Sequence, residues 1–443
     1  MQKKNYISSI FQSYLSDNTL ANIVSGESFI QKMLQFEMAL AKCQAELDII
    51  PKTAAQEIIT VVSSIQIQPE SLAESTRNNG IPTIELLNQI KAKLSASSAS
   101  YLHYGATSQD VIDTAYVLMI KESIEVLEAR LKVAIQAFGK QLQANKDIVI
   151  VGRTRTQQAV PLTLGIKIAN WINPLIHQYH HLEHIKTNVL RVQLGGAVGS
   201  LSTIKDQGQA LNHLMAKELQ LQVSFPWHND GSTIAEFTNW LTIISATIAK
   251  IAKDILTLSQ TEIGEVIENK NGGGKSSTMP HKNNPILSEA IVALGNQNIQ
   301  LNAASQASMI NMNERDAVAW MAEWLSIPHL IVSTGTILNH AVTIGQNMAF
   351  QTDKIEHNLQ MLNGLIYSEA ASFELQKYYT KSEAKKLVGN ACELVMKQNI
   401  GLATALKEVC KQEIDWESIF SSSNQKGISD ELVTHTLTRI AKI

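Results

Sequence analysis

The stretch IKESIEVLEARLKVAIQAFGKQL, residues 120–142, is the part of the sequence that decides the fold. Its large apolar residues recur at spacings of four and three: Ile120, Ile124, Leu127, Leu131, Ile135, Phe138 and Leu142. This period matches one face of an α-helix, so the stretch predicts an amphipathic helix several turns longer than is usual.

The sequence on either side of this stretch also favours long helices. No proline occurs in residues 83–160 or 329–443, which leaves room for long uninterrupted helices. Strand signals are weak, since runs such as Ile148–Val151 are short and isolated. We therefore predict an all-α protein built on a bundle of long helices, with smaller helical segments before about Tyr101 and after about Phe350.

The composition excludes several classes of protein. The 443 residues are 44% hydrophobic and 17% charged, as in an ordinary folded protein, and the net charge of -3 gives no reason to expect nucleic acid or an anionic membrane surface as partner. The most apolar stretch, Trp240–Leu256, contains Lys250 and Lys253 and predicts a buried core helix instead of a membrane span. The N-terminus has no apolar signal region, so we expect a cytoplasmic protein. The three cysteines, far apart, indicate neither disulfides nor a zinc site.

Three segments break the helical pattern, and each resembles a site more than a connection. They read HYGATSQD (His103–Asp110), GRTRTQQAVPLTLG (Gly152–Gly165) and NGGGKSSTMPHKNNP (Asn271–Pro285).

The first segment has the form of a capping box, with a hydroxyl at Thr107 and an acid three residues later at Asp110. The adjacent hydroxyls of Thr107 and Ser108, the free amides of the first turn and the helix dipole together suit a carboxylate or phosphate. Capping boxes are common, so these residues could equally do no more than cap a helix. His103, just outside the cap, is either a proton donor or a structural residue.

The third segment is more specific. Three consecutive glycines, Gly272–Gly274, predict a lid that becomes ordered when a ligand binds. The run GGGKS suggests a phosphate-binding P-loop, but Asn269 stands where that motif needs its first glycine, and Pro280 and Pro285 interrupt the helix that must follow.

The run SSTMPHKNNP resembles the signature of the fumarase/aspartase superfamily, and the other two segments resemble its two further signature blocks in the same order. Three other stretches are most similar to the 3-carboxy-cis,cis-muconate cycloisomerase branch, which belongs to the adenylosuccinate lyase family of that superfamily. These stretches are Val192–Leu201, Gln260–Val266 and Asn313–Trp324.

The resemblance implies three helical domains, which we place at residues 1–108, 109–350 and 351–443, and a homotetramer whose active sites each draw one block from three subunits. It implies that Ser276 is the catalytic base and that Lys282 and Asn284 hold the carboxylate of a small di- or tricarboxylate substrate. Thr107, Ser108, Thr154 and Gln157 would contact the rest of that substrate. No metal ion or organic cofactor is expected.

The chain departs from the family pattern at several positions. Arg155 replaces the histidine that other branches carry, which leaves the general acid undefined; His103 is our candidate, and Arg155 a further substrate contact. Gly231-Ser232-Thr233, Lys275, Asn283 and Asn313 also differ, which favours a substrate unlike the standard one.

Three functions remain open at this point. A lactone-forming cycloisomerase and a lyase that eliminates fumarate from a succinyl-amine use the same residues, and a catalytically silent structural relative would share the scaffold. A metal site at His177, His180, His181 and His184 is rejected, because no carboxylate or cysteine completes the set except Glu183.

Overall fold

The computed structural model describes residues 8–443. Residues 1–7, which begin the N-terminal segment expected to carry no targeting signal, lie outside the described residues. The described chain forms two compact units. The first contains the described residues up to Arg130 together with Gln178–Ala246 and Ala293–Leu338, and the second contains Leu131–His177, Thr247–Val292 and Asn339–Ile443. The three-domain division stays a prediction.

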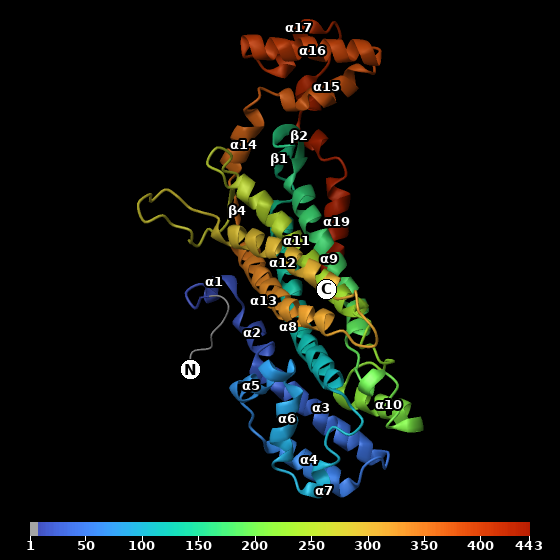
Figure 1. Ribbon diagram of the computed structural model, residues 1–443. Helices are drawn as coiled ribbons and strands as arrows, with labels where there is room; N and C mark the ends of the chain where they lie inside the picture. The colour runs from blue at the N-terminus through green and yellow to red at the C-terminus, as the bar shows by residue number, and fades with distance from the viewer. Residues whose placement is uncertain (1–7) are drawn as a thin grey trace. The chain divides into compact units, whose positions relative to one another are not determined.

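Five long helices contribute residues to both units: α8 (Ser108–Asn145), α9 (Leu164–Val189), α11 (Ser232–Leu258), α12 (Ile286–Ala307) and α13 (Ala317–Asn347) (Figure 1). The other elements of the first unit are α1 (Gln12–Leu15), α2 (Asn18–Ile23), α3 (Gly26–Glu46), α4 (Lys52–Ser64), α5 (Pro69–Asn79), α6 (Thr83–Lys91), α7 (Ala96–Ala99), α10 (Gly208–Leu219) and the 3-10 helices η1 (Gly196–Val198) and η2 (Lys205–Gln207).

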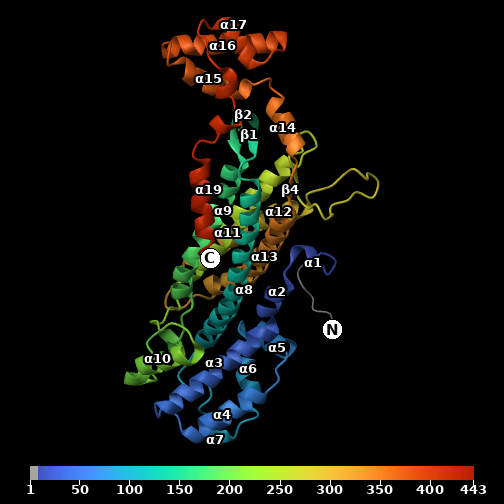
Figure 2. The same cartoon turned by 180° about the vertical axis from the view of Figure 1, so that it is seen from behind.

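The second unit contains the strands. β1 (Val149–Thr154) pairs antiparallel with β2 (Gln157–Thr163), and β3 (Val266–Ile267) pairs antiparallel with β4 (Ala349–Phe350). Its other helices are α14 (Thr352–Gln360), η3 (Leu365–Tyr367), α15 (Ser368–Leu375), α16 (Lys381–Gln398), α17 (Leu402–Val409), α18 (Trp416–Ile419), η4 (Ser422–Gln425) and α19 (Ser429–Ile440). The helices α15 to α18 share a small core around the buried Trp416, and α15, α16 and α17 lie together in both views (Figures 1 and 2).

The all-α prediction is confirmed. The periodic stretch lies in α8, which is 38 residues long, and none of its seven periodic apolar side chains is more than 1% exposed. Trp240–Leu256 lies in α11, where Trp240, Ile248 and Ile255 are buried and the two lysines are exposed. In the described part of the chain, no helix is long and apolar enough to cross a membrane.

The β1–β2 hairpin is a feature that local sequence did not predict. Two-residue hairpin turns favour Asn-Gly or Asp-Gly, because their residues need positive φ angles. Here Arg155 and Thr156 take φ angles of 50° and 71° without either signal. The pairing of the two strands, including Val149 with Thr163, holds this turn in place.

Candidate active site

One buried carboxylate braces the first turn of α8. Asp110 is 0% exposed, and its two oxygens accept hydrogen bonds of 2.8–3.0 Å from five donors: the backbone N–H groups of Thr107, Gly195 and Gly196 and the side chains of Gln193 and His228. So many donors offset the cost of burying a charge. A Cβ atom on Gly195 would lie 2.4 Å from His228 Cε1, so only glycine fits there. Asp110 therefore ties the start of α8 to the Gly195–Gly196 loop.

The predicted capping box is half formed. The Thr107 N–H donates to Asp110 Oδ2 at 2.9 Å, but the Thr107 hydroxyl accepts from Arg315 Nη2, also at 2.9 Å. Arg315 Nη2 donates further to the Ala197 carbonyl at 2.8 Å. We call Thr107, Ser108 and Arg315 the anion cradle, since the Thr107 hydroxyl and the Arg315 guanidinium meet beside Ser108, the first residue of α8, and such a setting suits an anion. Arg315 lies within the Asn313–Trp324 stretch, but local sequence does not reveal its bond to Thr107, because that bond joins residues 208 positions apart.

His103 lies on the turn that precedes α8, and a carboxylate of α3 holds it. His103 Nδ1 is 2.6 Å from Oε1 of the buried Glu37. Burial lowers the pKa of His103, but the charge of Glu37 and its hydrogen bond outweigh this, so the pKa is raised above its ordinary value.

Two further acidic side chains, Asp113 of α8 and Glu323 of α13, lie in the first unit. Asp113 accepts a hydrogen bond of 2.6 Å from Trp320 Nε1, and the negative charge of Glu323 repels that of Asp113. Burial raises the pKa of Glu323 to about 7 and that of Asp113 well above its ordinary range. An ordinary glutamate has a pKa near 4.5. The free energy of unfolding therefore falls as the pH rises from about 4.5 to about 7, because over this range the carboxyl ionises in the unfolded chain but stays protonated in the folded one.

The tip of the β1–β2 hairpin presents the residues predicted from the second segment. Thr154, Arg155 and Gln157 are exposed, and within residues 8–443 the Arg155 guanidinium has no hydrogen bond or ion pair. The strand below is anchored: Arg153 binds the fully buried Glu265 with two hydrogen bonds, of 2.7 and 2.9 Å. The Arg153–Glu265 pair therefore fixes the base of the hairpin, and the Arg155 guanidinium at its tip is unpaired among the described residues.

The glycine-rich segment narrows to a neck and then extends outward (Figures 1 and 2). At the neck, the Gly274 carbonyl accepts from both the backbone N–H and the side-chain amide of Asn284, at 3.0 and 2.8 Å. Lys275 pairs with Asn283 in an antiparallel bridge. Gly274 has a φ of 64°, and a Cβ atom there would lie 2.0 Å from the Asn284 carbonyl oxygen, so the neck requires glycine.

Ser276 and Lys282 lie beyond this neck. The Ser276 hydroxyl oxygen accepts from the backbone N–H groups of Thr278 and Met279, at 3.4 and 3.2 Å. Donors of this kind favour the alkoxide form that a serine base needs. Lys282 is exposed, and it takes part in no ion pair among the described residues.

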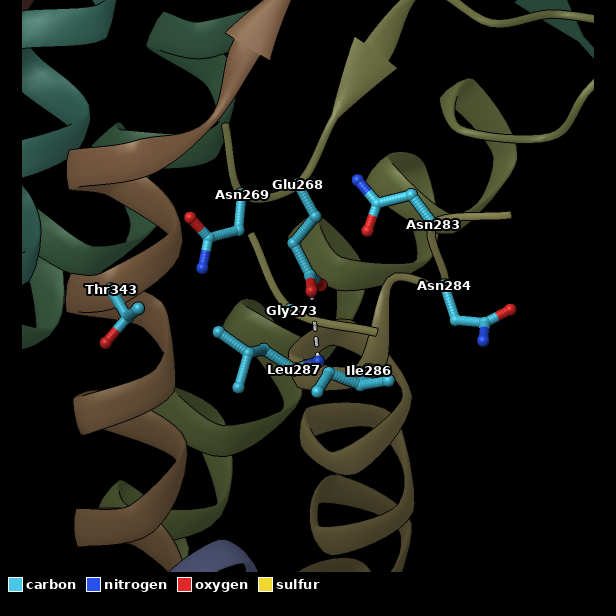
Figure 3. A pocket seen from close by; sticks show the side chains of 8 residues that line it. All are labelled: Glu268, Asn269, Gly273, Asn283, Asn284, Ile286, Leu287 and Thr343. Atoms are coloured by element: carbon cyan, nitrogen blue, oxygen red, sulfur yellow. Dashed lines mark hydrogen bonds between the residues drawn. The ribbon is translucent and has the colours of Figure 1, made fainter. Parts of the chain in front are cut away.

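A small pocket, of about 170 Å³, lies at the base of the loop (Figure 3). Asn284 lines it together with Asn269 and Asn283, and Glu268 lies between those two side chains in the view. The Glu268 carboxylate accepts from the N–H groups of Leu287 and Ser288, at 3.1 and 2.6 Å, and so caps α12. This capping fixes the end of the loop that carries Asn284.

The structure therefore places the predicted site residues in three groups. His103, Thr107 and Ser108 share the start of α8 in the first unit. The hairpin residues and the loop residues belong to the second unit, where no hydrogen bond or ion pair between described residues joins one group to the other. The structure adds Asp110, Arg315 and Glu37 to the prediction.

Two other sequence observations have structural explanations. The departure at Gly231-Ser232-Thr233 lies at the start of α11, where Asp230 accepts from the Ser232 N–H at 3.1 Å and Arg191 donates to the Thr233 hydroxyl at 2.9 Å. In the histidine-rich helix α9, His184 Nε2 lies 3.2 Å from Glu236. Within residues 8–443, no group of three or more His, Cys, Asp or Glu side chains is arranged to hold a metal ion.

Comparison with known proteins gives matches over most of the chain. A family model described as lyase matches residues 11–301. The 3-carboxy-cis,cis-muconate cycloisomerase of Acinetobacter baylyi is 33% identical over 410 residues, 91% of each chain. The N-acetyl-S-(2-succino)cysteine lyase of Enterococcus italicus is 31% identical over 83% of this chain and 81% of its own.

The solved structures agree with these sequence matches. The crystal structure of 3-carboxy-cis,cis-muconate lactonizing enzyme from Pseudomonas putida has a TM-score of 0.91 at 27% identity, and the match covers 98% of this chain and 99% of that one. The chain therefore belongs to the fumarase/aspartase superfamily, as an enzyme of its lyase and cycloisomerase class related to the 3-carboxy-cis,cis-muconate cycloisomerases.

Proposed function

We propose that this enzyme moves a proton on a carbon beside a carboxylate, in a reaction like that of 3-carboxy-cis,cis-muconate cycloisomerase. The observation that supports this most is the anion cradle, where Arg315 and the Thr107 hydroxyl are held together at the N-terminus of α8. A carboxylate bound there would meet a full positive charge, a hydroxyl and the helix dipole at once. The substrate is accordingly a small di- or tricarboxylate.

Each signature block supplies a role. Ser276 takes the proton from carbon, and Lys282 and Asn284 bind the carboxylate attached to that carbon. His103 gives a proton to the departing group. The remaining polar contacts to the substrate come from Thr107, Ser108, Thr154, Arg155 and Gln157.

The chemistry follows from where charge develops. When Ser276 removes the proton, the electron pair of the C–H bond spreads onto the carboxylate oxygens, where donors from Lys282 and Asn284 stabilise it, each by about 3 kcal/mol. The bond at the neighbouring carbon then breaks, its electron pair leaves with the oxygen or nitrogen, and that atom takes the proton of His103. In the lactone-forming direction the same steps run in reverse: a carboxyl oxygen adds to the double bond and gives its proton to His103, while Ser276, now the proton donor, protonates carbon.

We propose further that the enzyme is a homotetramer in which three subunits contribute to each active site, and that it is cytoplasmic. Large apolar side chains are exposed on the long helices of the first unit, including Ile299 at 46%, Leu325 at 73% and Val318 at 79%. Burying such faces against other copies would stabilise the assembly. Light scattering at micromolar concentration is expected to give four times the 48.8 kDa of one chain. A monomeric mass at micromolar concentration would contradict an active site shared between subunits.

An elimination that releases fumarate is the second candidate, and one observation favours it: the relative from Enterococcus italicus is named as a lyase of a succino-cysteine compound. Elimination uses the same base and proton donor, so the site supports both reactions. A silent structural role is less favoured, because Ser276, Lys282 and Asn284 are all present.

An activity screen separates these functions. The enzyme is incubated with 3-carboxy-cis,cis-muconate and, separately, with succinyl-amines and succinyl-thioethers, and both the loss of diene absorbance and the appearance of fumarate are followed. We expect loss of the diene without fumarate. Fumarate from a succinyl compound would establish the elimination, and inactivity on every substrate would favour the silent protein.

A further inference from the structure

We infer that Glu37 is a positioning residue for His103: its buried carboxylate binds Nδ1 of the imidazole, so that Nε2 carries the proton given to the departing group. The inference rests on the proposed role of His103 as general acid. It adds a residue of α3, well outside all three signature blocks.

The geometry fixes which nitrogen is free. Glu37 Oε1 lies 2.6 Å from His103 Nδ1, and the side chains are 0% and 13% exposed. Because an ionised carboxylate only accepts hydrogen bonds, Nδ1 is the donor in this pair. Among the described residues no hydrogen bond involves His103 Nε2, and the imidazole keeps an accessible edge. A histidine that is held by a carboxylate at one ring nitrogen and is free to exchange a proton at the other is the arrangement found in catalytic dyads and triads.

Packing alone does not explain a glutamate at position 37, because burying its carboxylate is unfavourable. It is 1% exposed on a face of α3 that otherwise buries Met33, Phe36 and Leu40, and its second oxygen, Oε2, has no hydrogen-bond partner. A buried carboxylate that is only partly satisfied costs free energy, and an apolar residue of similar size would often be more stable there. Its contact to His103 gives a reason for a carboxylate at this position.

The turn itself is held so that His103 keeps this orientation. His103 has a φ of 61°, which is unusual for a residue other than glycine and persists only where the surroundings enforce it. Gln44, two helical turns beyond Glu37 on α3, donates to the Tyr104 carbonyl at 2.6 Å. Gly105 follows at a φ of 75°, and a Cβ atom there would lie 2.6 Å from Ile204 Cδ1. Helix α3 thus contacts the turn at two points, through Glu37 and Gln44.

The charges around the imidazole favour its protonated form. Glu37 on α3 and Asp110 on α8 raise the pKa of His103, whereas burial and Lys91 on α6 lower it, and the balance is a raised value. A general acid loses activity as the pH rises through its pKa. Neutralising Glu37 removes the charge that raises this pKa, so the alkaline limb of the pH profile moves to lower pH when the reaction runs in the bond-breaking direction, in which His103 is the proton donor.

The test compares Glu37→Gln with wild type and with Glu46→Gln, a change of the same chemistry at an exposed residue of α3 that has no hydrogen bond or ion pair among the described residues. Histidine is labelled with ¹³C at Cε1, and His103→Asn, which tolerates a positive φ, identifies the His103 signal by its loss. The imidazole titration and the pH profile of kcat/KM in the bond-breaking direction, from the lactone or a succinyl compound, are then measured on the same proteins.

We expect Glu37→Gln to move the His103 titration and the alkaline limb of kcat/KM to lower pH, with about a hundredfold lower kcat at neutral pH, and Glu46→Gln to move neither. An unchanged His103 titration in Glu37→Gln overturns the inference. A titration that moves while the alkaline limb does not overturns the part of Glu37 in proton donation. Because the titration needs no substrate, it stands even when the proposed substrate is wrong. If Glu37→Gln does not fold, Glu37→Asp is measured instead; it keeps the charge but draws the carboxylate back by one methylene, so a smaller shift of the His103 titration in the same direction is expected, and no shift overturns the inference.

Discussion

Replacing Ser276 with alanine is expected to lower kcat by about a thousandfold or more, the upper range for loss of a base or an essential donor. KM should change little, because a serine hydroxyl adds little ground-state binding beside the charge of Lys282. The physical reason for choosing this serine is its position: its oxygen accepts two backbone N–H groups of its own loop, which favour the alkoxide. Steady-state kinetics on the substrate found in the activity screen measure both parameters.

Ser277→Ala is the matched control, since Ser277 is the adjacent hydroxyl and its side chain accepts no such bond among the described residues. It should be the milder change. Lys282→Ala should impair both KM and kcat, because the ammonium meets the carboxylate before and during proton transfer. A severe Ser277→Ala with a nearly normal Ser276→Ala would move the assignment by one residue. If neither serine matters and His103→Asn abolishes turnover, the histidine is the base.

The second large effect is on stability. Replacing Asp110 with alanine leaves five donors, four of them buried and one partly buried, without their acceptor. Each unsatisfied group costs about 1–3 kcal/mol, and because neighbouring losses do not add we expect a total near 3–5 kcal/mol. The anion cradle should be lost as well, since Thr107 is held through its N–H by Asp110.

Urea unfolding followed by tryptophan fluorescence tests this expectation, with Asp206→Ala as control. Asp206 is exposed and has no hydrogen bond to its side chain among the described residues, so its replacement should stay within about 0.5 kcal/mol of wild type. An Asp110→Ala protein that unfolds at the same urea concentration as wild type would show that the five donors find other partners.

The sequence was sufficient for features that depend on neighbouring residues. Hydrophobic spacing predicted the long helix now seen as α8, and the apolar stretch with its two lysines predicted the buried part of α11. The three segments that break the helical pattern marked the start of α8, the hairpin and the glycine-rich loop. The order of these segments and the residues in them were specific enough to identify the family, because each signature lies within a few consecutive residues.

Other features were missed because they depend on residues that are remote in the chain. The capping box Thr107-x-x-Asp110 predicted that the threonine hydroxyl would bind its own helix, but Arg315, 208 positions away, takes that hydroxyl. The Arg155-Thr156 turn has no glycine, so only the strand pairing on both sides reveals it.

The periodicity in α8 predicted one buried face, yet residues 110–115 are all buried, because other parts of the first unit cover the remaining faces. By itself, then, the sequence determined the long helices, the family and the position of the glycine-rich loop, since a helical period and a signature are properties of adjacent residues. Only the tertiary structure decided which charges meet. Asp110 binds Gly195 across 85 positions and Glu37 binds His103 across 66, and these pairings exist because packing the helices excludes water and leaves each buried polar group to find its partner within the fold.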